Sequence, residues 1–216
     1  MAARFDAAAP TAGSWARDVL ELSDWRRRVF ELYREVRAGA DAAEGWRIWR
    51  AGRDELFAHH PQSPLPEDQR ASFRGLAYFD YDPSARLLAT VVSVEPVTLD
   101  ITTSDNNAYR FTRFGNATFE LNDESLGLEL YWLEGYGGGV YLPFADATSG
   151  TTSFGGGRYL LDTVKGADLG TIGEQLVLDF NFAYNPSCAY NPRWSCPLAP
   201  PANRLAVEIR AGERTA

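Results

Sequence analysis

The change of pattern near Phe73 is the feature that most constrains the fold of this chain. From this residue onward, short runs of alternating apolar and polar residues follow one another, separated by turn-forming stretches such as 104–107 and 122–125. Alternation with a period of two places successive side chains on opposite faces of an extended strand. None of the intervening stretches holds a helix long enough for a parallel crossover. We therefore predict a mainly β fold, an all-β barrel or barrel-like sandwich, behind N-terminal α-helices.

The expected strands are short and closely spaced. Leu126, Leu128 and Leu130 share one face of such a run, as do Val97 and Leu99 in another. We expect strands over residues 86–94, 97–103, 109–114, 116–121, 126–133, 140–144, 157–161, 175–182 and 204–210.

Ahead of the strands, apolar residues recur at helical spacing. Two helices are expected, one from about Trp15 to Gly39 with a cap signal at Ser23-Asp24, and one over about 41–57. The prolines within 61–66 end this helical portion. We expect three parts within a single domain: a flexible start (1–14), a helical N-terminal segment (15–60) and a β-rich domain (61–216).

Charge and hydropathy exclude several classes of partner. The formal net charge of −8 and the acidic pI of about 4.8 disfavour nucleic-acid binding, because an acidic surface repels phosphate backbones. The chain starts without a signal-peptide pattern, and no run approaches the length of a membrane span. The expectation is therefore a soluble cytoplasmic protein with reduced thiols and a small polar ligand as its partner, without nucleic acid or membrane.

The stretch 176–182 suggests a polar site. In an extended strand, Asp179 and Asn181 lie on one face, while Leu178 and Phe180 lie on the other. If the polar face lines a cavity, the two side chains can orient a polar ligand. They could also be merely solvated, or they could hydrogen-bond the backbone of the loop that follows.

Arg158 is the second candidate for ligand binding. It follows a glycine-rich stretch that lacks the Gly-Lys-Ser/Thr of a phosphate-binding loop. Its guanidinium could clamp a carboxylate or phosphate, or it could pair structurally with Asp146, Asp162 or Asp179. The expected ligand-binding set lies at one end of the β structure and comprises Arg158, Asp179, Asn181, Tyr184 and Trp132.

Catalytic signals are weaker. Asp179 and Glu213 are candidate acid/base groups, and His60 is a candidate general base or a loop hydrogen-bonding residue. No cofactor or metal site is predicted. Cys188 and Cys196 could be buried thiols, a disulfide in an exported protein, or, least expected, a metal-binding or nucleophilic pair.

Several stretches resemble one known family. They are Arg53–Phe57, His60–Leu65, Phe73–Phe79, Phe144–Gly150, Gly156–Leu160 and the tail from Asp179 to Glu213. On these stretches the chain resembles, over roughly residues 44–213, the bacterial and archaeal family called domain of unknown function 1684. The family has no established activity, so the resemblance implies a fold and the location of a site but no chemistry.

Three functions remain open. The first is a small-molecule-binding β domain with the pocket described above. The second is a hydrolase of a small polar, acidic or sugar-like substrate, with a carboxylate as acid/base and Arg158 orienting the substrate. The third is a structural or protein-interaction module that uses exposed Trp15, Trp25 and Trp46 on the helices.

Overall fold

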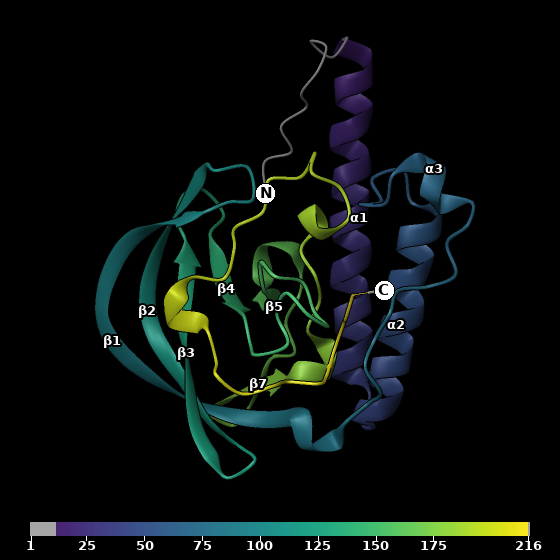
Figure 1. Cartoon of the computed structure of the whole chain (residues 1–216). Helices are drawn as coiled ribbons and strands as arrows, with labels where there is room; N and C mark the ends of the chain where they lie inside the picture. Colours follow the sequence, from purple (N-terminus) through teal and green to yellow (C-terminus); the bar gives the residue numbers. More distant parts are fainter. Residues whose placement is uncertain (1–11, 216) are drawn as a thin grey trace.

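The computed structural model describes residues 12–215 and contains a helix pair packed beside a curled sheet (Figure 1). Helix α1 (Ala12–Ala38) runs through Ser23-Asp24 without a break and ends just before Gly39. Helix α2 (Ala42–His59) is capped by the Asp41 carboxylate, which accepts a hydrogen bond from the amide of Glu44. A short helix, α3 (Glu67–Arg70), follows the proline-rich stretch.

The boundary predicted for the flexible start needs a correction. Residues 12–14 belong to α1, and residues 1–11 lie outside the described part of the chain. No helix within residues 12–215 combines the length and the apolar character needed to cross a membrane.

The sheet has seven strands, and all its ladders are antiparallel. The strands are β1 (Arg86–Thr102), β2 (Ala108–Leu121), β3 (Glu124–Leu133), β4 (Gly139–Phe144), β5 (Arg158–Asp162), β6 (Thr171–Ile172) and β7 (Gln175–Asp179). Their order is β5-β4-β3-β2-β1-β7-β6, so the curled sheet stays open. A mainly β fold with N-terminal helices is thereby confirmed.

In two places, a pair of separately predicted strands forms one long continuous strand in the structure. β1 covers 86–94 and 97–103 almost entirely, because a register shift between Ser93 and Val97 absorbs Pro96 without ending the pairing. β2 likewise passes through Gly115, where the register with β3 shifts. Residues that signal turns thus mark irregularities inside continuous strands here.

The strand predicted over 175–182 is wrong in its second half. β7 ends at Asp179, and Phe180–Phe182 form a 3₁₀ turn. The Asp179 carboxylate accepts a hydrogen bond from the Asn181 amide, which favours the turn over further extension.

The strand predicted over 204–210 is also absent. The segment runs beside residues 145–147 through single backbone hydrogen bonds and one isolated bridge, instead of a ladder. Its alternation still separates buried Ile209 from exposed Arg210.

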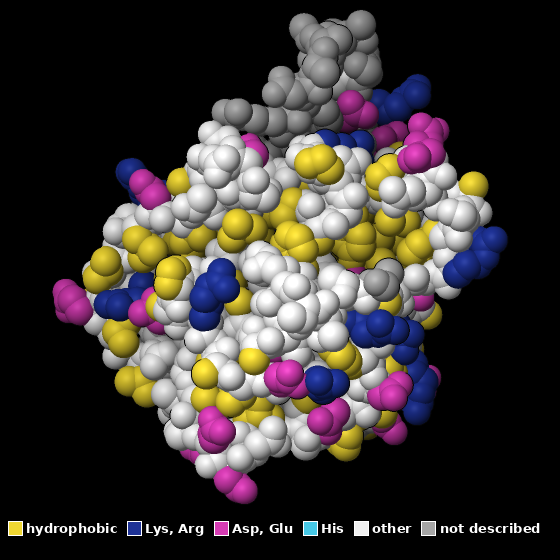
Figure 2. All heavy atoms as spheres, in the orientation of Figure 1, with side chains coloured by type: hydrophobic (Ala, Val, Ile, Leu, Met, Phe, Trp, Pro, Cys, Tyr) yellow, Lys and Arg dark blue, Asp and Glu magenta, His cyan; other side chains and the backbone are white. Residues whose placement is uncertain are grey.

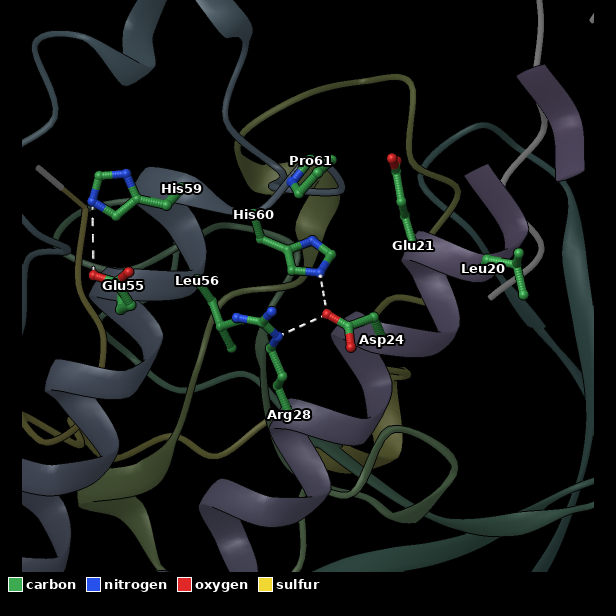
Figure 3. A pocket seen from close by; sticks show the side chains of 9 residues that line it. All are labelled: Leu20, Glu21, Asp24, Arg28, Glu55, Leu56, His59, His60 and Pro61. Atoms are coloured by element: carbon green, nitrogen blue, oxygen red, sulfur yellow. Dashed lines mark hydrogen bonds and ion pairs between the residues drawn. The ribbon is translucent and has the colours of Figure 1, made fainter. Parts of the chain in front are cut away.

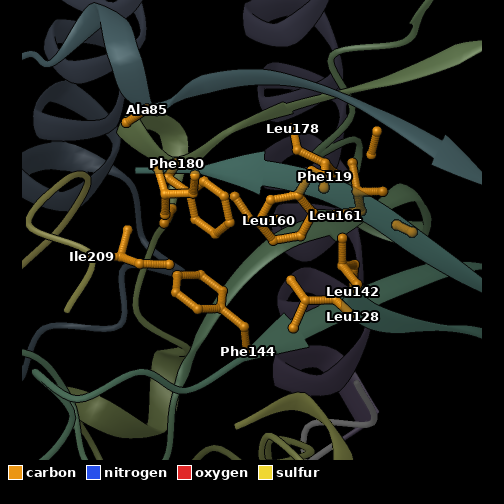
Figure 4. Close-up of a cluster of buried hydrophobic side chains, with 14 of the residues drawn as sticks. Ala85, Phe119, Leu128, Leu142, Phe144, Leu160, Leu161, Leu178, Phe180 and Ile209 are labelled. Carbon is orange, nitrogen blue, oxygen red and sulfur yellow. The ribbon is translucent and has the colours of Figure 1, made fainter. Parts of the chain in front are cut away.

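Hydrophobic cores fill the curl of the sheet and the space under the helices. Figure 4 shows Phe119, Phe144 and Phe180 among the leucines that fill the curl. A second cluster, rich in aromatic residues, packs the helix pair against Phe182 and the segment 65–78. Among the tryptophans considered for an interaction surface, Trp46 is buried, Trp25 is half-buried and Trp15 is half exposed.

Candidate ligand pocket

A pocket of about 380 Å³ lies where α3 and the residues after it meet the C-terminal segment, residues 204–215. We call it the Glu213 pocket. Its walls are largely apolar and include Phe73, Phe154 and Tyr190. Five polar residues also line it: Gln69, Asn185, Glu213, Arg214 and Thr215. Apolar walls with a few converging polar groups are typical of small-molecule sites.

The backbone around Glu213 is held from both sides. The Glu213 amide donates to the carbonyl of Ala183, and the Arg214 amide donates to the carbonyl of Ala77. Gly212, with φ of +79°, allows this close approach, since an added Cβ would lie 2.6 Å from the Phe180 oxygen. The carboxylate is therefore placed by a rigid local structure.

Glu213 forms a buried ion pair with Arg53 on α2. The Arg53 Nη2 atom lies 2.7 Å from Glu213 Oε2, which also accepts a hydrogen bond from the Asn185 amide at 3.0 Å. Arg53 donates from Nε to the Tyr78 hydroxyl, and its guanidinium stacks on the rings of Trp49 and Tyr184. The carboxylate therefore has a fixed counter-charge on its inner side.

Burial dominates the electrostatics of this pair. Glu213 is 1% exposed, and its burial raises the pKa of the carboxyl, while Arg53 opposes that shift. Burial alone would lower the pKa of Arg53, but Tyr78 and Glu213 outweigh it and raise that pKa. The pair thus places a carboxylate in the wall of the pocket, with its compensating cation behind it in the lining of a smaller neighbouring cavity.

Two buried polar groups of the pocket have no partner. Asn185 is 6% exposed, and its Oδ1 atom accepts no hydrogen bond from any described residue. The Tyr190 hydroxyl is likewise buried without a hydrogen bond within residues 12–215. Buried polar groups are nearly always paired in folded proteins, so these two call for an explanation.

Arg158 lies away from this pocket and is fully buried. Its guanidinium donates to the carbonyls of Ile209, Ala211 and Glu213 and forms an ion pair of 3.2 Å with Asp146. Of the partners predicted for a structural bridge, Asp146 is the one found. Arg158 thus ties β5 to the C-terminal segment, and its hydrogen bond to Glu213 goes to the backbone carbonyl.

Asp179 and Asn181 lie together, as expected, but Arg158 is not among their partners. Asn181 Nδ2 donates to Asp179 Oδ1 at 2.9 Å and to the Asp82 carbonyl at 2.7 Å, and its Oδ1 accepts from the Asp82 amide. Asp179 is also 3.4 Å from Arg86, while burial raises its pKa. The contacts are those of the third alternative, bonds to nearby backbone. The ligand-binding role assigned to these residues stays a prediction, and the geometry favours the Glu213 pocket.

The two aromatic candidates are in different places. Tyr184 packs against Tyr159 and Arg53 and lines a smaller cavity of about 60 Å³, which shares Asn185 with the Glu213 pocket. Trp132 on β3 is 43% exposed and contributes to neither cavity.

His60 lies in a separate groove between α1 and α2, also about 380 Å³ (Figure 3). Its Nδ1 atom accepts a hydrogen bond from the Gln62 amide, so Nε2 carries the proton that points to Asp24, 3.3 Å away. Asp24 in turn binds Arg28. Both ring nitrogens are engaged, and the described residues that line the groove include no Ser, Thr or Cys nucleophile.

The stability of the helix pair should depend on the protonation of His60. Burial lowers the pKa of His60 below its ordinary value of 6.5, against the opposing effect of Asp24. The unfolded chain therefore takes up the proton first, so stability present above pH 6.5 should fall as the pH drops toward the folded-state pKa. Urea unfolding at pH 7.5 and 5.5 measures this loss.

The neighbouring histidine provides the control. His60→Gln should reduce the loss of stability between pH 7.5 and 5.5. His59→Gln should leave it unchanged, because the His59 side chain is 72% exposed. An equal loss in wild type and both variants would refute the role of His60.

The thiols carry no disulfide. Cys196 is buried and Cys188 is half-buried, and both are free. Across residues 12–215, no group of three or more His, Cys, Asp or Glu side chains is arranged to hold a metal ion.

Sequence reasoning named Glu213 but missed its closest partners. Arg53 belongs to a stretch that carried the family resemblance, yet its role depends on Glu213, 160 positions away. Asn185 and Tyr190 lie in the proline-containing loop of residues 184–201, which lines the Glu213 pocket. The Tyr190 ring packs on Phe57 of α2 and so holds this loop against the helix.

The fold and the pocket define a class of mainly β proteins in which a C-terminal segment joins an open antiparallel sheet to N-terminal helices. The chain belongs to the family described as Protein of unknown function (DUF1684), whose model matches residues 71–214. It is similar to the solution NMR structure of the uncharacterized protein from gene locus rrnAC0354 of Haloarcula marismortui. The two share 40% sequence identity with a TM-score of 0.58, over 78% of this chain and 91% of that one. The comparison with curated proteins gives no match.

Proposed function

We propose that this protein binds a small organic molecule in the Glu213 pocket. The observation that carries the proposal is the buried, unpartnered carboxamide oxygen of Asn185 beside the Glu213–Arg53 pair. Buried polar groups without hydrogen-bond partners lower the free energy of unfolding of the protein. A ligand that hydrogen-bonds these groups would raise it again. The volume of about 380 Å³ lies at the lower end of the roughly 300–1,000 Å³ common for such sites.

The surface supports a small ligand over a nucleic acid. On the face shown in Figure 2, Lys and Arg side chains alternate with Asp and Glu, and hydrophobic side chains form a band across the middle. The net charge of −8 would repel a phosphate backbone. A cytoplasmic location, where thiols stay reduced, would fit the free Cys188 and Cys196.

A hydrolase is the second candidate, because Glu213 combines burial, a raised pKa and a place in the pocket. Glu213 is, however, the sole carboxylate among the described residues that line it, whereas carboxylate-based glycosidases commonly use two. Binding without turnover therefore fits the pocket better.

The test is the identification of small molecules that co-purify with the protein. Denaturing extraction and mass spectrometry should find one organic compound close to equimolar with wild type. The double variant Asn185→Leu/Tyr190→Phe should lose it, because both hydrogen-bonding groups are removed while the volume is nearly kept.

The variant Tyr136→Phe is the matched control, since Tyr136 is fully exposed and should not affect retention. The proposal would be refuted if the double variant retained the compound as well as wild type does. It would also be refuted if the wild-type protein carried no bound compound and bound no added compound.

A further inference from the structure

The hydrogen-bonding groups of the Glu213 pocket restrict the chemistry of what it can hold. The Asn185 Oδ1 atom accepts no hydrogen bond from any described residue, and the residue lines the pocket. A carboxamide offers one acceptor and two donors in a plane. The matching group is another planar amide edge, which returns an N–H to the oxygen and a carbonyl to the NH₂.

Glu213 adds a second acceptor. Both hydrogen bonds that it accepts go to Oε2, so Oε1 is without a hydrogen bond among the residues that the structure describes. The backbone amide of Asn185 donates to that same carboxylate, and the side chains of Asn185 and Glu213 line the same pocket. A further N–H of the ligand can therefore be accepted next to the Asn185 contact.

The charges argue for an uncharged ligand group at Glu213 Oε1, and Arg214, which also lines the pocket, already donates to the carbonyls of Tyr78 and Thr215. Arg53 already compensates Glu213, and its remaining faces lie against aromatic rings. A carboxylate placed against Oε1 would meet a buried like charge, which is costly where water is largely excluded. An uncharged N–H donor meets Oε1 without that cost.

The aromatic side chains in the walls of the Glu213 pocket favour a ligand with a flat ring. Phe73 and Phe154 line the pocket, and Phe73 stacks on Phe57 with an interplanar angle of 26°. Tyr190 closes the pocket from the loop side and has an unpartnered hydroxyl. Aromatic walls with polar groups at one end suit a planar ring with a polar edge.

We infer that the Glu213 pocket takes an uncharged, planar ring compound that presents an N–H and a C=O side by side with a second N–H, as a primary carboxamide does. This inference rests on the proposed function and names its ligand class. The amide edge pairs with the Asn185 carboxamide, and an N–H of the ligand donates to Glu213 Oε1.

Three probes of one shape test the assignment: benzamide, N,N-dimethylbenzamide and benzoate. The dimethyl compound has no N–H, and benzoate replaces the amide by an anion. Titrations followed by saturation-transfer NMR should show benzamide binding at least ten-fold more tightly than the other two, about the effect of one lost hydrogen bond. Asn185→Leu should remove that preference, whereas Gln175→Leu at an exposed position of β7 should keep it.

Each other result overturns the assignment in a distinguishable way. Equal binding of all three probes, unaffected by Asn185→Leu, overturns the amide recognition but leaves a binding pocket. Tighter binding of benzoate overturns it in favour of an anionic ligand. If none of the three probes binds and a compound of another class co-purifies, the ligand class is refuted but the proposed function is not. Binding of none without any co-purified compound refutes the proposed function as well.

Discussion

Arg158→Ala is expected to lower the free energy of unfolding by about 3–5 kcal/mol, the usual cost of breaking a fully buried ion pair by removing one partner. The change leaves the Asp146 carboxylate buried without its cation. It also frees the carbonyls of Ile209, Ala211 and Glu213 inside the protein. Urea unfolding followed by tryptophan fluorescence measures the loss.

Two further variants sharpen this experiment. Arg158→Lys keeps the charge but not the planar fork that reaches several acceptors, so its cost should be intermediate. Arg210→Ala removes an exposed arginine that pairs with Glu208 at the surface, and it should leave the free energy of unfolding almost unchanged. If Arg158→Ala also stayed within 1 kcal/mol of wild type, its proposed role in holding the C-terminal segment would be wrong.

Replacing Asn181 and Asn185 by leucine should give opposite results. Asn181→Leu removes three side-chain hydrogen bonds and leaves the Asp82 amide without its acceptor, so we expect a loss of about 3–5 kcal/mol. Asn185→Leu removes a buried polar group that has no partner, so the protein should be unchanged or up to about 1 kcal/mol more stable. Thermal and urea unfolding of the two variants compare these effects directly.

The contrast separates structure from function. Both asparagines are buried, at 0% and 6% exposure, so burial alone would predict similar losses. A large loss for Asn185→Leu would mean that its carboxamide is satisfied within the protein, and the case for the pocket would fail. A stabilised variant that no longer retains the ligand would be typical of a residue kept for binding at a cost in stability.

Local patterns predicted the elements of this fold but not their extent. The antiparallel strands followed from alternation, which depends on neighbours two positions apart. The continuity of β1 past Pro96 depends on its pairing with β2, which no local signal records. The alternation of 204–210 indicated correctly which side is buried. The segment nevertheless forms isolated backbone hydrogen bonds with Ala145 and Ala147 instead of the continuous ladder that defines a strand.

The site could be predicted only in part, for a related reason. An acid near the end of the chain and a pinned proline-rich loop are visible in the sequence, and both line the pocket. The pairing of Arg53 with Glu213 arises from tertiary packing alone. Whether a polar side chain finds a partner is equally a tertiary property, which is why Asn185 was missed while Asn181 stood out.

The Arg53–Glu213 pair joins residues 160 positions apart, and this separation has a consequence for synthesis in the cell. The helices emerge from the ribosome long before the segment that completes their aromatic cluster and the pocket. Until that segment is available, Trp49 and Phe57 lack part of their cover, and folding must wait for contacts of high sequence separation. Nascent chains stalled before residue 209 should therefore remain sensitive to protease, and resistance should appear only when Glu213 has cleared the exit tunnel.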